Sequence, residues 1–200
     1  VGGAVRDLIL GREVKDVDIE VHNIKSYDLE ASLEKFGNVS LIGKKFGVFN
    51  IAHSNVDWAL PRRDSKGRKP KVEIDPDMTL EDAMRRRDLT MNAMAINITE
   101  LCSLEKCKPE IIDWFGGKQD IKDKVLRAVD KDLFLDDPLR FFRVMQFVGR
   151  FEMEPDEELD EICRKMSLRD SNSESEIARE RIYEELRKLF LKSRRPSLGI

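Results

Sequence analysis

The hydrophobic pattern of the chain changes character a little past its midpoint. Up to about residue 115, short runs that alternate apolar and polar residues stand between helical stretches, whereas nearly all of the remaining sequence has helical spacing. Side chains of a strand alternate between two faces, while those of a helix return to one face every three or four residues. The sequence therefore predicts an α+β fold in two parts: a small mixed or antiparallel sheet with helices in residues 1–115, and an all-helical part in residues 116–200.

The individual elements follow from these periods and from the positions of glycine and proline. Strands are expected at Val17–His22, Val39–Ile42, Phe46–Ala52 and Val56–Leu60, and helices at Ala4–Leu10, Asp28–Phe36, Thr79–Arg87, Asp137–Phe151, Glu157–Met166 and Ser175–Lys192. The polar segment Arg62–Asp77 has little periodicity and is predicted to be a mobile loop.

Composition narrows the class of protein. The net charge of −3 argues against a general affinity for nucleic acid, so any contact with RNA must be local. No apolar run is long enough to span a membrane and no leader opens the sequence, so we expect a cytoplasmic protein without a membrane partner. The cysteines, Cys102, Cys107 and Cys163, lack metal-ligand spacing and are odd in number, which predicts reduced thiols rather than disulfides or a zinc site.

Two glycines, Gly2 and Gly3, stand directly before the first expected helix. Backbone N–H groups and the helix dipole at such a position favour a phosphate group, and Arg6 could add charged donors. The same pair would also suit a tight turn with no ligand.

Two carboxylates, Asp16 and Asp18, begin the next expected strand. Because side chains alternate along a strand, both are predicted to project from one face. Such a pair suits a hard cation such as Mg²⁺, although a solvated strand edge would show the same pattern. The possible phosphate-binding turn just upstream supplies the usual partner of the metal, a triphosphate, and Asp57 on a later strand could be a third acid.

A second group of polar residues suggests recognition of a base. On a helix, Asp137 and Arg140 share a face and Arg143 lies one turn further on. Cytosine and adenine both present an amino donor beside a ring-nitrogen acceptor, so a carboxylate and a guanidinium could pair with either, whereas guanine and uracil reverse the order. The spacing thus indicates selection of C and A, unless Asp136 or Asp137 only caps a helix that begins at Pro138.

A third group of polar residues lies in the sequence between the two carboxylates and the group that suggests base recognition. Asp88 and Asn92 are one helical turn apart among apolar residues, directly after the basic run Arg85–Arg87. We interpret this partly buried polar face as part of a nucleotide pocket, although the arginines alone could be surface charge. His22 and His53, in contrast, have no partnered nucleophile and are not expected to be catalytic.

In this order, the motifs resemble those of the class II tRNA nucleotidyltransferases, a family that includes CCA-adding enzymes and bacterial poly(A) polymerases. The resemblance covers nearly the whole chain. It rests on Gly2–Asp7 with the helix end Leu8–Gly11 and Asp16-x-Asp18, on Arg86–Ala95, on Asp113–Gly117, on Asp136–Arg143, and on Glu180–Ile182 with Glu185–Leu186. Asp136 stands where the family usually has Glu, and Trp114 where it usually has Pro.

The resemblance implies a catalytic nucleotidyltransferase head of the DNA polymerase β type, residues 1–115, and a helical neck, residues 116–200. The family's strand leading into Gly2 and its C-terminal body and tail lie outside these residues. The implied substrates are CTP, ATP and a tRNA or other RNA 3′ end, with Mg²⁺ as the cofactor. The resemblance implies metal binding for Asp16 and Asp18, ribose binding for Arg87 and Asp88, and base recognition by the helix that carries Asp137, Arg140 and Arg143. The residues themselves add Asp57 as a third catalytic acid, Gly2, Gly3 and Arg6 as triphosphate-binding residues, and Asn92 as a further residue at the ribose.

Relatives with different specificities share these motifs. We expect addition of CCA to tRNA, and the sequence leaves open a poly(A) polymerase or a partial enzyme that adds only CC or only A. A binding module that has lost catalysis is a further alternative, against which the presence of Asp16 and Asp18 argues.

Overall fold

The computed structural model describes residues 1–42, 47–64, 72–99, 110–168 and 177–200. These residues form two compact units. The first unit contains the described parts of residues 1–85 and 92–115, and the second contains residues 86–91 together with the described parts of residues 116–200. Of the helices in these residues, none is long and apolar enough to cross a bilayer.

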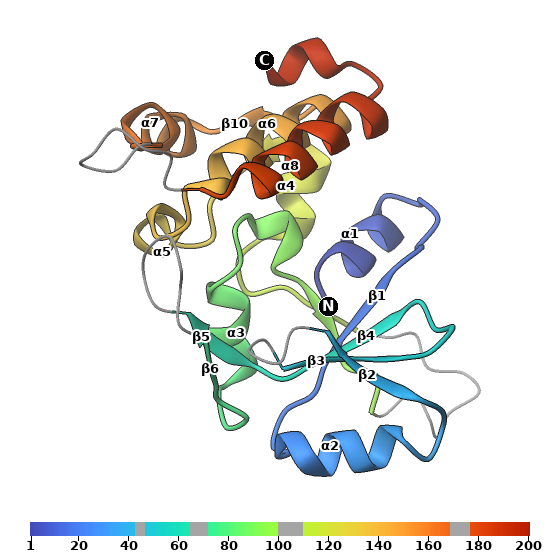
Figure 1. Ribbon diagram of the computed structural model, residues 1–200. Helices are drawn as coiled ribbons and strands as arrows, with labels where there is room; N and C mark the ends of the chain where they lie inside the picture. The colour runs from blue at the N-terminus through green and yellow to red at the C-terminus, as the bar shows by residue number, and fades with distance from the viewer. Residues whose placement is uncertain (43–46, 65–71, 100–109, 169–176) are drawn as a thin grey trace. The chain divides into compact units, whose positions relative to one another are not determined.

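The first unit is built around a four-stranded mixed sheet with the order β1-β4-β3-β2 (Figure 1). Strand β1 runs parallel to β4, and the other neighbours are antiparallel. In chain order the unit contains α1 (Gly3–Ile9), β1 (Val17–Glu20), α2 (Ser26–Leu33), β2 (Val39–Ile42), β3 (Val48–Ile51), β4 (Val56–Ala59), β5 (Arg62–Asp64), β6 (Val72–Ile74), α3 (Leu80–Arg85), β7 (Ala95–Ile96) and β8 (Ile111–Ile112). The predicted small mixed sheet is confirmed.

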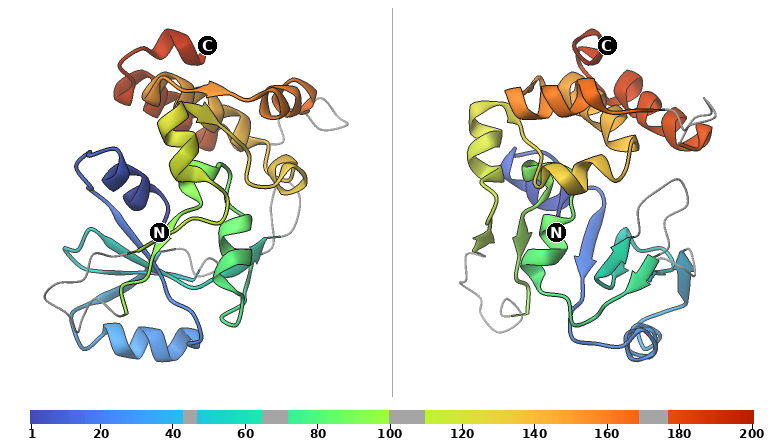
Figure 2. Two further views of the ribbon diagram at one scale, coloured as in Figure 1. Left: turned by 180° about the vertical axis from the view of Figure 1, so that it is seen from behind. Right: turned by 90° about the vertical axis from the view of Figure 1, so that its left-hand side faces the viewer.

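Each strand of this sheet has an apolar face and a more polar face. Phe49 and Trp58, on neighbouring strands, pack with Leu29 and Leu33 of α2 in one hydrophobic cluster. Helix α2 therefore covers one face of the sheet, and α1 lies on the other side of it (Figure 1, Figure 2). Because side chains alternate along each strand, the residues between these apolar positions point to the side away from α2.

The segment predicted to be a mobile loop contains regular structure, which corrects that prediction. Strands β5 and β6 pair antiparallel, with Arg63 opposite Glu73. Arg63 also forms an ion pair with Asp75, with its Nη2 atom 2.8 Å from Oδ2. Hydrophobic periodicity did not predict this ladder, because the pairing of two three-residue strands depends mainly on backbone hydrogen bonds. Such bonds place few requirements on the type of side chain.

His22, just after β1, contacts two oxygen atoms. Its Nδ1 atom lies 3.0 Å from the Met78 carbonyl oxygen, and its Nε2 atom lies 3.0 Å from Glu20 Oε1. Both partners only accept hydrogen bonds when Glu20 is ionised, so the geometry favours the doubly protonated imidazolium. The hydrogen bond to Glu20 accordingly raises the pKa of His22 above its ordinary value.

We expect this contact to make the stability of the chain dependent on pH. A histidine whose pKa is raised by folding stabilises the folded chain fully below its unfolded pKa of 6.5. This stabilisation is lost as the pH rises through the higher folded pKa. Replacing His22 by glutamine should lower the free energy of unfolding by about 1 kcal/mol at about pH 6, since the pair is partly exposed, and by less at about pH 8.5. Urea unfolding at the two pH values measures this difference, and an equal loss at both would contradict it.

The second unit is mainly helical, as expected. In chain order it contains α4 (Gly117–Asp123), β9 (Val125–Leu126), α5 (Lys131–Leu135), α6 (Leu139–Phe151), β10 (Glu154–Pro155), α7 (Glu157–Lys165), α8 (Arg179–Lys192) and the 3₁₀ helix η3 (Pro196–Gly199). The two-residue strands β9 and β10, which pair in parallel, were not predicted. Such a short ladder has no periodicity of its own to detect.

Helices α6 and α8 pack closely against each other in the second unit. Gly149 allows this approach, because a Cβ atom there would lie only 2.5 Å from Leu189 Cδ1. Leu189 is fully buried, as are Phe134, Leu126 and Leu159 of the neighbouring elements. On α7, Cys163 is a free thiol whose pKa burial raises to about 11, while Cys102 and Cys107 lie outside the described residues.

Candidate functional site

A row of polar side chains crosses the sheet of the first unit on the face away from α2. The parallel pairing of β1 with β4 makes Asp18 the register partner of Asp57, and the antiparallel pairing of β4 with β3 places Asn50 opposite Asp57. Register partners carry their side chains on the same face of a sheet. We call Asp18, Asp57 and Asn50 the polar row.

The carboxylates of the polar row differ in their surroundings. Asp18 is exposed, whereas Asp57 is half-buried and its Oδ1 atom accepts a hydrogen bond from Asn50 Nδ2 at 2.9 Å. Asp16 is also exposed but precedes the strand, since β1 begins at Val17. Strand alternation therefore places the Asp18 side chain on this face but does not determine the direction of the Asp16 side chain. The prediction that both carboxylates project from one face is thus supported for Asp18 only.

The donor set of the polar row suits a hard divalent cation. Mg²⁺ prefers oxygen ligands, keeps several of its waters, and commonly binds one or two carboxylates together with substrate phosphates. The adjacent carboxylates of Asp18 and Asp57 meet that need, with Asp16 two residues before Asp18. Within the described ranges, no group of three or more His, Cys, Asp or Glu residues is arranged to hold a metal ion, so the fit rests on a pair of acids.

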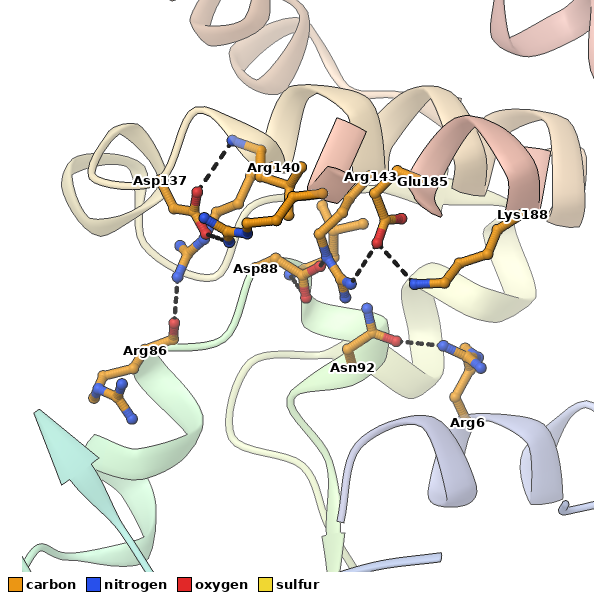
Figure 3. Close-up of polar contacts among 12 residues, drawn as sticks. Arg6, Arg86, Asp88, Asn92, Asp137, Arg140, Arg143, Glu185 and Lys188 are labelled. Carbon is orange, nitrogen blue, oxygen red and sulfur yellow. Dashed lines mark hydrogen bonds and ion pairs between the residues drawn. The ribbon is translucent and has the colours of Figure 1, made fainter. Parts of the chain in front are cut away.

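Arg6 and Asn92, which the sequence places in the same site, meet in the first unit. Arg6 is buried, and its Nη1 atom donates to Asn92 Oδ1 at 2.7 Å while its Nε atom donates to Asp7 Oδ1 at 2.8 Å (Figure 3). Its guanidinium lies against the start of α1, where a Cβ atom on Gly3 would be 3.4 Å from Arg6 Nη2. The Gly2 N–H donates to the Met94 carbonyl at 2.9 Å, with Gly2 at a φ of 65° that only glycine adopts easily.

In the second unit, a chain of charges links Asp88 to α6 and α8. Arg143 Nε donates to the buried carboxylate of Asp88 at 2.6 Å, and Arg143 Nη1 lies 3.7 Å from Glu185 Oε1 (Figure 3). Lys188 Nζ donates to the same Glu185 oxygen at 2.8 Å. Burial alone would lower the pKa of Arg143, but Asp88 and Glu185 raise it more, so the guanidinium is firmly charged. The charges fix Arg143 in one orientation.

The two residues predicted to recognise a base are also held in place. Asp137 Oδ1 accepts from the Leu139 N–H at 3.1 Å, and Oδ2 accepts from Arg181 Nη2 at 2.9 Å. Arg140 donates to the carbonyls of Leu133 at 3.0 Å and of Arg86 at 2.6 Å (Figure 3). One carboxylate oxygen of Asp137 therefore binds the start of α6, which was the alternative to base recognition, while the other oxygen contacts Arg181.

Several partners in these contacts were not identified as site residues from the sequence. Glu185 and Arg181 appeared there only as parts of the fifth motif, and Asn50 was not singled out. A buried acid on an amphipathic helix is a usable signal for Glu185. Asn50 gives no such signal, because one amide on a strand is ordinary. Arg87, also predicted for the site, is half-buried beside Asp88.

The fold and the site geometry define a nucleotidyltransferase-type α+β fold, in which a small mixed sheet carries paired carboxylates. Residues 1–127 match the family described as the poly(A) polymerase head domain. The chain therefore belongs to that family, as the resemblance of its motifs predicted.

Individual relatives agree with this assignment. The chain is 36% identical over 191 residues to a multifunctional CCA protein of Paracidovorax citrulli, covering 93% of this chain and 42% of that protein. It is 38% identical over 158 residues to an A-adding tRNA nucleotidyltransferase of Aquifex aeolicus, covering 75% of this chain and 18% of that protein. Thus the chain spans less than half the length of these relatives.

A solved structure shows the same fold. A tRNA nucleotidyltransferase crystallised with a primer tRNA and an incoming ATP analogue superposes with a TM-score of 0.73 at 30% identity, covering 94% of this chain and 51% of that one.

Proposed function

We propose that this chain carries the catalytic head and helical neck of a template-independent RNA nucleotidyltransferase that adds CCA to tRNA 3′ ends from CTP and ATP. The observation that supports this most directly is the pairing of Asp18 with Asp57 on one face of the sheet, in a chain that belongs to the poly(A) polymerase head-domain family. Since tRNA and nucleoside triphosphates are its substrates, we place the reaction in the cytoplasm.

The proposed reaction joins the RNA 3′-oxygen to the α-phosphorus of the nucleotide, and the bond from that phosphorus to pyrophosphate breaks. Asp16 and Asp18 would hold Mg²⁺, with Asp57 as a third acid beside Asp18. When bound, the ion lowers the pKa of the 3′-hydroxyl and offsets charge on the phosphates. Gly2, Gly3 and Arg6 steady the triphosphate, so that the attack is in line.

In the second unit, the proposed roles are positioning of the ribose and selection of the base. Arg87 and Asp88 are the proposed ribose-positioning residues of this unit. Arg181 holds the Asp137 carboxylate in place. Arg140, with five N–H groups, retains donors after bonding two carbonyls. Such a pair fits the edges of cytosine and adenine and mismatches those of guanine and uracil, which leaves polar groups unpaired.

Addition of A alone is the second candidate, either once or repeatedly. The observation in its favour is the 38% identity to an A-adding tRNA nucleotidyltransferase. The two candidates share the proposed metal site and differ in the number and order of bases added.

Incorporation of each labelled nucleotide onto a tRNA acceptor minihelix that lacks its CCA end tests the proposal. We expect Mg²⁺-dependent addition of C, C and then A, with GTP and UTP used at least about a hundredfold less well because an unpaired buried polar group penalises the wrong base. Addition of A alone would favour the second candidate. Magnesium-dependent binding of CTP without turnover, in this chain and in a longer one, would contradict both.

A further inference from the structure

The amide of Asn50 has an unusually well-determined orientation. Its Nδ2 atom lies 2.9 Å from Asp57 Oδ1, 3.1 Å from the Val56 carbonyl oxygen and 3.4 Å from the Ser54 carbonyl oxygen. All three neighbours are acceptors, so an inverted amide would place Oδ1 against three oxygen atoms. The NH₂ group therefore faces Asp57.

The Asp57 carboxylate needs such a partner for two reasons. It is the register neighbour of Asp18, so two negative charges lie side by side on adjacent strands. Its terminal torsion is also soft, and a single hydrogen bond from Asn50 removes much of that rotational freedom. A neutral N–H from Asn50 both stabilises the Asp57 carboxylate beside Asp18 and restricts its rotation. It does so without adding a positive charge that would compete with a cation.

The backbone around Asn50 makes this contact rigid. Asn50 lies opposite Asp57 in the antiparallel pairing of β3 and β4, and its amide also bonds the turn that leads into β4. The amide contacts only Oδ1 of Asp57, so Oδ2 and the second lone pair of Oδ1 can still bind a cation.

We propose that Asn50 is a positioning residue that orients the Asp57 carboxylate for cation binding beside Asp18. This inference rests on the proposed function, because it assumes that the polar row holds a divalent cation. It goes beyond that function in assigning a role to a residue that contacts neither RNA nor nucleotide in the proposed reaction.

Binding of Mn²⁺ to the chain, measured by electron paramagnetic resonance without nucleotide, tests the inference. Mn²⁺ is a suitable probe because it shares the preference of Mg²⁺ for carboxylate ligands. We expect Asn50→Val, which suits a strand but lacks the amide, to weaken Mn²⁺ binding about tenfold, as changes at partners of metal ligands usually do. Circular dichroism verifies that the variant is folded, and the near-isosteric Asn50→Leu replaces it if the valine variant is not.

The matched control is Ser54→Ala. The Ser54 hydroxyl accepts from the Val56 N–H at 3.0 Å, so this variant loosens the same turn without removing the amide that contacts Asp57. We expect its Mn²⁺ affinity to stay within about twofold of the original, since the ligand's own partner is intact. In addition, Asn50→Val should have little further effect when Asp57 is already asparagine, because contacting residues are coupled.

The outcomes separate the inference from the function on which it rests. Weaker binding in Asn50→Val, near-original binding in Ser54→Ala and non-additivity with Asp57→Asn would support the positioning role. Unchanged binding in Asn50→Val, or equal losses in Asn50→Val and Ser54→Ala, would overturn that role alone, provided that Asp18→Asn and Asp57→Asn still weaken binding. If those two substitutions also leave Mn²⁺ binding unchanged, the metal site of the proposed function fails, and the inference fails with it.

Discussion

Replacing both Asp16 and Asp18 with alanine is expected to lower nucleotide incorporation by about a thousandfold or more. In the proposed reaction the pair would supply carboxylate ligands for Mg²⁺, and loss of metal assistance would remove several kcal/mol of transition-state stabilisation. A loss of about 4 kcal/mol corresponds to a factor of about a thousand in rate. Asp18 is exposed on the face of the sheet away from α2, so its removal should leave the hydrophobic cluster intact. Single-turnover incorporation of labelled CTP at saturating minihelix measures the effect.

The matched control carries alanine at Asp28 and Glu34, two exposed acids at the ends of α2. It makes the same change in net charge on the opposite side of the sheet. Incorporation by the control should remain within a few-fold of the original chain, because isolated surface charges contribute little. If the Asp16 and Asp18 variant retains most of its incorporation while remaining folded, these aspartates do not hold the catalytic metal.

The second large effect concerns two adjacent glycines in the third motif. A Cβ atom on Gly117 would lie 2.2 Å from the Thr90 carbonyl oxygen and 2.7 Å from its carbon, both of them backbone atoms. Gly116, in contrast, has a φ of 76° but nothing within 4 Å of the site of its Cβ. Gly117→Ala should therefore lower the free energy of unfolding by about 3 kcal/mol through overpacking, and Gly116→Ala by about 1 kcal/mol through backbone strain.

Urea unfolding followed by circular dichroism distinguishes the two causes. Asparagine tolerates a positive φ better than alanine, so Gly116→Asn should recover part of the loss at that position. No such recovery is expected at Gly117, where the obstacle is the backbone of Thr90. Similar losses of about 1 kcal/mol for both alanine variants would show that the segment containing Thr90 moves aside easily and that overpacking at Gly117 is small.

Local patterns in the sequence predicted much of the fold. The alternation in β1, β3 and β4 and the helical spacing of α6, α7 and α8 lie within a few residues of the expected bounds. Boundaries were less accurate, since α2 ends at Leu33 rather than near Phe36. The hairpin of β5 and β6 was missed altogether, because its three-residue strands are too short to show a period.

The candidate site shows the same division between local and long-range information. Sequence reasoning selected Asp18, Asp57, Asp88 and Arg143 one by one, from residue type, spacing and the resemblance of the motifs. It did not predict that Arg143 would contact Asp88, 55 positions away, or that Arg6 would contact Asn92, 86 positions away. Those contacts give the buried guanidinium of Arg6 and the half-buried guanidinium of Arg143 an oxygen partner each.

By itself, the sequence determined the α+β class, the family and the residue types of the site, because periodicity and motifs are properties of neighbouring residues. The tertiary structure alone decided which side chains meet. Strand order made Asp57 the neighbour of Asp18 and of Asn50, and the packing of α6 with α8 brought Glu185 to Arg143. The physical reason is that pairing between distant segments depends on strand register and close packing of the whole chain, which no local repeat encodes.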